Sequence, residues 1–176
     1  MVVAAFALFG RRCAKGEKDF LTAERHLRPL ALREKSAAVL NALAWHAVLQ
    51  DAVGRQALDD SLAANKQRAF ESGPCLHTLA AIYAELGRTN DAMEGLRSSV
   101  AARGGHLCDC DLYVLGRIAE QYELADVAAA LYRRVSRQSA AQDVYGLAER
   151  RLKKLGAAIP PPSPPVRSSP VPLSGS

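Results

Sequence analysis

The sequence lacks the short motifs that mark most nucleotide-binding and hydrolytic enzymes. Its 176 residues contain no glycine-rich phosphate loop, no Gly-x-Ser-x-Gly elbow and no pair of carboxylates in an apolar setting. Cys75 and His77 suggest a nucleophile and its base, but residues two positions apart on a helix do not face each other. We therefore predict a non-enzymatic protein with no catalytic residues and no cofactor.

Long apolar segments are missing as well. The apolar start of the chain, residues 2–9, is too short to span a bilayer. A secretory signal would place basic residues before such a segment and small residues after it, whereas Gly10, Arg11 and Arg12 follow here. We predict a cytoplasmic protein without membrane contact. A periplasmic location stays open if the natural chain begins upstream, and the abrupt apolar start is typical of a chain cut from something longer.

Cysteine is scarce and never occurs as C-x-x-C. The four cysteines are Cys13, Cys75, Cys108 and Cys110. His106, Cys108 and Cys110 offer three zinc ligands in five residues, but a zinc site needs a second ligand pair, and none is evident. We predict no metal and an ordinary loop in which Asp109 or Asp111 caps the next helix. A Cys108–Cys110 disulfide would close a small, strained ring.

A continuous basic surface is also absent, although the net charge is +5. The charge is +4 over residues 1–36, −5 over 37–132, +5 over 133–156 and +1 in the remaining tail. Nucleic-acid binding needs an unbroken basic track along the phosphates. The acidic centre therefore argues against an RNA reader of the pentatricopeptide kind, and we predict no nucleic-acid partner.

What the sequence does contain is a repeat at an interval of 36 residues. Its members are Leu40, Leu76 and Leu112, then Leu43, Leu79 and Leu115, then Ala44, Ala80 and Gly116. Apolar residues in the middle copy, 76–88, fall at i, i+3, i+4 and i+7 on one helical face, and Gly87 allows a tight turn. The next segment, 91–100, carries on one side Ala92, Leu96, Ser99 and Val100. This pattern predicts an antiparallel helical hairpin in each copy. The small residues Ala80 and, in the next copy, Gly116 are predicted to lie where the two helices of their hairpin cross.

The other copies are less regular. Copy 108–139 has Glu123 where the turn glycine is expected, and the second helix of copy 37–72 slips by one residue around Ala57, Leu62 and Ala64. We predict one helical domain over 1–156. Its parts are units at about 2–36, 37–72, 73–107 and 108–139 and a capping helix at 142–156 that exposes Arg150, Lys153 and Lys154. The Pro- and Ser-rich residues 157–176 are predicted to be a disordered tail.

Leucine, a small residue, tyrosine, glycine and then alanine at these intervals resemble the tetratricopeptide repeat. The resemblance implies an all-α solenoid of antiparallel hairpins that binds a protein or peptide in its concave groove. The residues expected to face that groove are Asn41, Trp45, His77, Tyr113, Arg117 and Glu120. Trp45 could equally lie in the core. The Lys and Asn set that clamps a C-terminal carboxylate in some members of this family is not at these positions, and the oligomeric state stays open.

Residues 38–156 also resemble the C-terminal repeat region of large bacterial proteins that carry a transglutaminase-like domain. The resemblance rests on the segments 57–60, 76–80, 83–89, 113–122 and 147–152. It implies that a Cys-His-Asp domain would lie upstream, and nothing in this chain corresponds to it. Two functions follow as hypotheses: a protein-interaction scaffold, or a non-catalytic accessory segment of a transglutaminase-like or peptidase-like enzyme.

Overall fold

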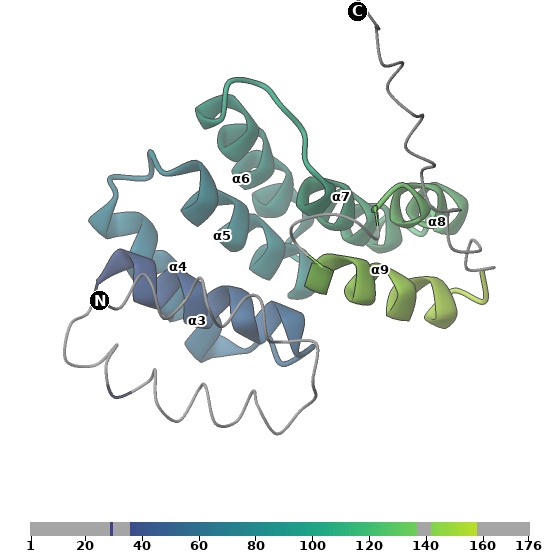
Figure 1. The fold of residues 1–176 in the computed structure, drawn as a ribbon, viewed down its shortest axis with the longest axis horizontal. Helices are drawn as coiled ribbons and strands as arrows, with labels where there is room; N and C mark the ends of the chain where they lie inside the picture. The colour runs from purple at the N-terminus through teal and green to yellow at the C-terminus, as the bar shows by residue number, and fades with distance from the viewer. Residues whose placement is uncertain (1–28, 30–35, 137–141, 158–176) are drawn as a thin grey trace, which may run out of the picture.

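In the computed structural model, which describes residues 29, 36–136 and 142–157, the described part of the chain contains helices and no strand. The helices are α3 (Ala37–Leu49), α4 (Arg55–Gln67), α5 (Gly73–Glu85), α6 (Thr89–Ala102), α7 (Asp109–Gln121), α8 (Ala125–Arg133) and α9 (Gln142–Lys154) (Figure 1). The predicted all-α class is confirmed. The predicted unit 2–36 and tail 157–176 lie almost wholly outside the described residues.

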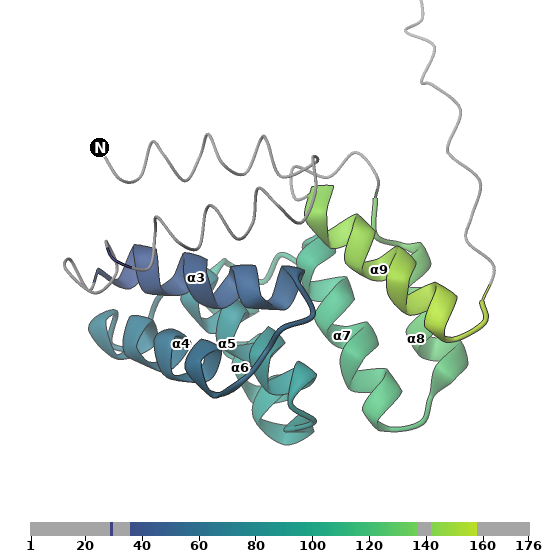
Figure 2. The ribbon, with the colours of Figure 1, turned by 90° about the horizontal axis from the view of Figure 1, so that it is seen from below.

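Consecutive helices pack in pairs, α3 with α4, α5 with α6 and α7 with α8 (Figure 2). Each predicted unit of 37–72, 73–107 and 108–139 holds one pair. Successive pairs also contact each other, because α5 packs on α3 and α4, and α7 packs on α5 and α6. The apolar face of each pair is thereby buried against its neighbour.

The first helix of each pair repeats the sequence interval in its bounds. These helices begin at residues 37, 73 and 109 and end at 49, 85 and 121. Each is followed by a residue with positive φ: Asp51 at 56°, Gly87 at 72° and Glu123 at 60°. In all three, the backbone N–H groups of this residue and of the one after it close the helix end as in a Schellman motif, for example Arg88 to the Tyr83 carbonyl at 2.8 Å. Asp51 and Glu123 therefore adopt the left-handed backbone that glycine adopts without steric cost.

The second helices are less regular, as the sequence predicted. The buried residues of α4 include Ala57, Ser61 and Ala64, and those of α6 are Ala92, Leu96 and Ser99. Each α4 residue of this set lies 35 residues before its α6 counterpart, one residue less than the repeat interval of 36. The predicted slip is confirmed, although Ser61, and not the half-buried Leu62, takes the buried position. The connection before α4 is correspondingly longer, at residues 50–54 against 86–88 before α6.

Small residues let the helices of a pair approach each other. A Cβ added at Gly95 of α6 would lie 3.2 Å from the Cβ of Ala80 on α5, and a Cβ added at Gly116 of α7 would overlap the Tyr132 ring of α8. Ala80 and Gly116 were predicted at these crossings, and the prediction is confirmed.

Helix α9 packs on α7 and α8 and also contacts α3. It buries Val144, Leu147, Ala148 and Leu152 and exposes the predicted Arg150, Lys153 and Lys154. Two of these cations bind the end of α3: Arg150 donates to the Leu49 carbonyl at 2.8 Å, and Lys154 lies 3.0 Å from the Asp51 carboxylate. The last described helix is thus joined to the first described pair.

Candidate functional site

The residues expected to line an open groove are largely buried. Tyr113 and Arg117 on α7 are 2% and 6% exposed, His77 on α5 is 8% exposed, and Glu120 is half-buried. Helices α5 and α9 both pack against α7 on the side where these α7 residues lie. Neighbouring helices therefore cover Tyr113 and Arg117, which the sequence placed facing an open groove.

Tyr113 and Arg117 take part in a charged network that joins α5 to α7. The Tyr113 hydroxyl donates to Glu85 Oε1 at 2.7 Å, and Arg117 Nε donates to the same oxygen at 2.9 Å. Arg117 Nη1 also lies 3.0 Å from Glu120 Oε2. Burial lowers the pKa of the Arg117 guanidinium, but the hydrogen bond and charges of the two glutamates outweigh it, so the pKa stands above its ordinary value. Arg117 is held as a cation between two carboxylates.

The network continues from Glu120 to α8 and α9. Arg151 Nε donates to Glu120 Oε1 at 2.9 Å, its Nη2 binds the other carboxylate oxygen, and the Tyr132 hydroxyl donates to Oε1. Burial raises the pKa of Glu120, but the hydrogen bonds from Arg151 and Tyr132 and the nearby cations lower it overall. We call these residues the inner cluster: Glu85, Tyr113, Arg117, Glu120, Tyr132 and Arg151. Its two carboxylates and two guanidiniums are mutually paired, so it supplies neither a general base nor an open anion site.

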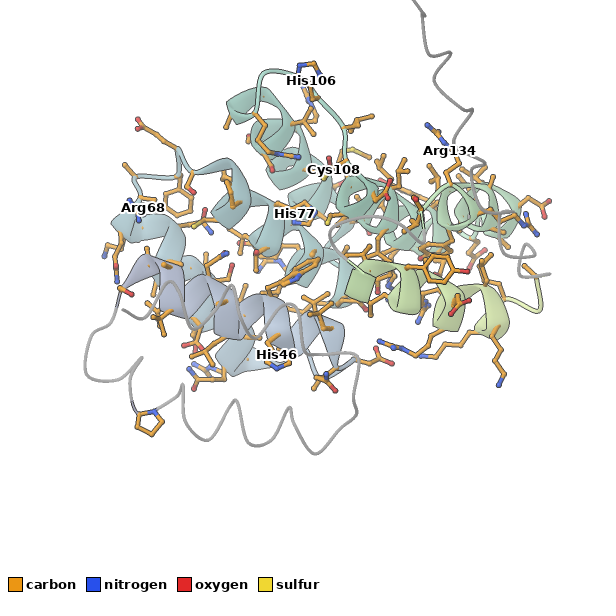
Figure 3. The ribbon with its side chains drawn as sticks, viewed as in Figure 1. His46, Arg68, His77, His106, Cys108 and Arg134 are labelled. Atoms are coloured by element: carbon orange, nitrogen blue, oxygen red, sulfur yellow. The ribbon has the colours of Figure 1, made fainter. Side chains whose placement is uncertain are left out.

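The remaining predicted residues lie at the other end of the same face. Trp45 of α3 is half-buried and packs against the core, with its ring centroid 5.2 Å from that of His77. His77 itself lies on α5 (Figure 3). Asn41 is half-buried, and its Oδ1 is a buried atom without a hydrogen-bond partner among the described residues. Packing places Trp45 partly in the core. Whether any of these residues binds a partner stays a prediction.

A second polar cluster lies where α7 begins. Cys108 is the N-cap residue, and its backbone N–H donates to Asp111 Oδ2 at 2.7 Å in a capping box. Arg103 reaches both residues: Nη2 donates to Asp111 Oδ1 at 2.7 Å and Nη1 to Cys108 Sγ at 3.3 Å. Asp109, the alternative cap, instead accepts from the Ser136 backbone N–H at 3.0 Å. We call Arg103, Cys108, Cys110 and Asp111 the cap cluster.

His77 approaches the cap cluster from α5. Its Nε2 lies 3.6 Å from Asp111 Oδ1, and no described residue forms a hydrogen bond with this nitrogen. Burial, more than any charge, lowers the pKa of His77, which keeps the ring neutral at pH 7. The described residues contain no group of three or more His, Cys, Asp or Glu side chains placed to hold a metal ion.

An apolar groove lies on the opposite side of α7 from the inner cluster. It has a volume of about 400 Å³, and its lining residues are Met93, Leu96, Arg97, Val100, Ala101, Gly105, Leu107 and Leu115. Leu115 is two positions from both Tyr113 and Arg117, about 200° around a helix of 3.6 residues per turn. Met93 and Leu107 are 37% and 58% exposed. We call this surface, formed by α6, α7 and the loop between them, the outer groove.

The sequence prediction did not include the outer groove. Met93 and Leu107 fall outside the 36-residue pattern, so nothing in the repeat marks them. Two apolar residues off the repeated face are the only sequence signal, and single exposed apolar residues are common on protein surfaces.

Comparison with known proteins does not assign the chain to a family. No protein-family model matches it, and no curated protein or solved structure is similar enough to count as a match. Within the described ranges, none of the helices combines the length and apolar character needed to cross a bilayer.

Proposed function

We propose that this protein is a protein-interaction module built from tetratricopeptide-like hairpins, and that it binds its partner in the outer groove. The 36-residue periodicity of helix bounds and of positive-φ residues supports the repeat assignment. The observation that carries the binding site is the apolar groove of about 400 Å³ between α6 and α7. The concave face foreseen from the family resemblance is less suited to this role, because its two large α7 side chains, Tyr113 and Arg117, are already packed and paired.

The outer groove suits an amphipathic helix of a partner protein. Its lining offers apolar surface along about two turns of α6, from Met93 to Val100, and exposed apolar surface of this kind marks sites of interaction. Large apolar side chains at helical spacing on the partner would bury Met93 and Leu107, which water now contacts.

Arg97 adds a requirement for negative charge. It lines the groove and lies 3.6 Å from Glu94, with side chains that are 76% and 71% exposed. An ion pair this exposed contributes little to stability, so the guanidinium can exchange Glu94 for a carboxylate on the partner at small cost. The predicted ligand is therefore an amphipathic helix with an acidic residue beside its apolar face. The alternative of an accessory segment beside a transglutaminase-like domain stays a prediction of the sequence alone.

The test begins with a photo-crosslinking amino acid at Leu107 in the full-length chain, expressed in the source cell. Crosslinked peptides identify the partner segment, and calorimetry with that purified segment gives its affinity. Met93→Ser, Leu107→Ser and Arg97→Glu are each expected to weaken binding about tenfold or more, since few interface residues carry most of the energy.

Leu124→Ser and Val127→Ser are the matched controls. Both residues are apolar and exposed, at 50% and 48%, but neither lines the groove. Binding should be unchanged in these variants. Loss of binding in the controls with retention in the groove variants would place recognition at the α7–α8 end and contradict the proposal, as would a crosslinked segment without helical apolar spacing.

A further inference from the structure

The Cys108 sulfur lies on the surface of the cap cluster, where several donors converge on it. Arg103 Nη1 donates to Sγ at 3.3 Å, and the neighbouring Cys110 thiol is the group that most lowers the pKa of Cys108. The backbone N–H of Asp111, in the first turn of α7, completes the capping box with the same side chain. Each of these donors stabilises a thiolate more than a thiol.

The charges around Cys108 act in both directions. The hydrogen bond from Cys110, followed by that from the Asp111 backbone, lowers the pKa of the Cys108 thiol to about 6, against the opposing effects of burial and of the Asp111 carboxylate. Arg103, at the end of α6, is the cation that faces the sulfur, and His77, from α5, is neutral. Because the hydrogen bond to Cys108 and burial raise the pKa of Cys110, this second thiol keeps its proton.

His77 leaves one buried polar atom beside the cap cluster without a hydrogen bond. Its side chain is 10% exposed, and its unpaired Nε2 faces Asp111, which Arg103 already neutralises. Buried polar atoms without a partner are rare and call for an explanation. A second arrangement would satisfy this nitrogen: Arg103 turns to an incoming carboxylate, and His77 takes up a proton and pairs with Asp111. The Arg103 side chain is 25% exposed, so it is accessible to such a ligand.

We propose that Cys108 is a thiol modification site that forms mixed disulfides with small disulfides carrying carboxylate groups, whose charge Arg103 recognises. The Cys108 thiolate attacks one sulfur of the disulfide, and the S–S bond of the reagent breaks as the new S–S bond forms. The departing half leaves as a thiolate, which takes a proton from water. Cys108 is oxidised and the departing half reduced, so the disulfide is the only oxidant required.

The first experiment measures iodoacetamide alkylation of the native full-length protein across pH, with each cysteine followed separately by peptide mass spectrometry. Alkylation of Cys108 should reach half its maximal rate near pH 6, whereas an ordinary thiol would do so near 9. Cys75 is buried and should not react until the protein unfolds. A Cys108 midpoint near 9, or faster alkylation of Cys75 or Cys110, would overturn the proposal.

Two substitutions at Cys110 separate its hydrogen bond from its reactivity. Cys110→Ser keeps a donor and should leave the Cys108 midpoint close to that of the natural protein. Cys110→Ala removes the donor and should raise the midpoint by about one pH unit or more. If both variants kept the Cys108 midpoint of the natural protein, Cys110 would have no effect on the Cys108 thiol, and this would contradict the proposal.

The second experiment compares glutathione disulfide, hydroxyethyl disulfide and cystamine, which are anionic, neutral and cationic. Each rate is normalised to the rate of the same reagent with N-acetylcysteine. The anionic reagent should react fastest, giving one adduct at Cys108, and Arg103→Gln should abolish this order of preference. Preference for cystamine, an order unchanged in Arg103→Gln, or an internal Cys108–Cys110 disulfide as the product would each refute the assignment.

Discussion

The two sides of α7 differ in what their side chains contact. On the side facing α5 and α9, Tyr113 and Arg117 are buried and every charge of the inner cluster is paired. On the side facing α6, Leu115 lines a groove in which Met93 and Leu107 remain exposed. Tyrosine and arginine are enriched in binding hot spots, yet here they hold helices together. Residue type alone therefore does not separate a binding face from a structural one.

The largest expected effect comes from removing the carboxylate at the centre of the inner cluster. Glu120→Ala would leave Arg117 and Arg151 poorly paired between packed helices, which should cost on the order of 3 kcal/mol in the free energy of unfolding. Urea denaturation measures this. Asp59→Ala is the control, because the Arg55–Asp59 pair is 94% and 58% exposed and should contribute almost nothing. A similar midpoint in both variants would show that the inner cluster does not hold the helices together.

An intermediate effect is expected at the helix crossing of the third pair. Gly116→Leu places side-chain atoms where the Tyr132 ring lies, so it should destabilise the protein by about 1 to 3 kcal/mol. Gly146→Ala on α9 is the matched control: its added Cβ meets nothing closer than the Arg150 guanidinium at 3.9 Å, and alanine favours helix by about 1 kcal/mol. An unchanged thermal midpoint in Gly116→Leu would contradict the close approach of α7 and α8.

A smaller effect is expected from pH. Because the folded pKa of Glu120 is lowered from its ordinary value of 4.5, its contribution to stability is present above pH 4.5 and is lost as pH falls through the folded pKa. Glu120→Gln should therefore lose less stability than the natural protein between pH 5 and 3, as followed by urea midpoints. Equal pH dependence in the two proteins would mean that Glu120 ionises as freely in the folded state as in the unfolded chain.

The sequence predicted most of the fold of the described residues because helical periodicity and small-residue positions are local patterns. Ala80 and Gly116 marked the crossings, and the one-residue slip of the second helix in 37–72 was visible in Ala57 and Ala64. The packing of α9 over the Tyr113 and Arg117 side of α7 was not predictable in this way. It depends on Arg151 of α9 meeting Glu120, a contact between residues 31 positions apart that no repeat pattern encodes.

The same reason explains why the burial of Tyr113 and Arg117 was not foreseen. A repeat pattern shows which residues of α7 are off the shared seam, and Tyr113 and Arg117 are off it. It does not show whether another element then covers them. In this chain α5 and α9 do so, while the loop residue Leu107, which no periodicity identifies, lines the exposed groove.

The most direct measurement of the contrast between the two sides of α7 is the free energy of unfolding of Tyr113→Ala and Leu107→Ala, determined side by side in urea. If the inner side is core and the outer side is free surface, Tyr113→Ala should lose about 3 kcal/mol or more, and Leu107→Ala should lose less than about 0.5 kcal/mol. Losses that are small in both variants would mean that Tyr113 faces solvent, as an open concave groove requires, and would contradict the account.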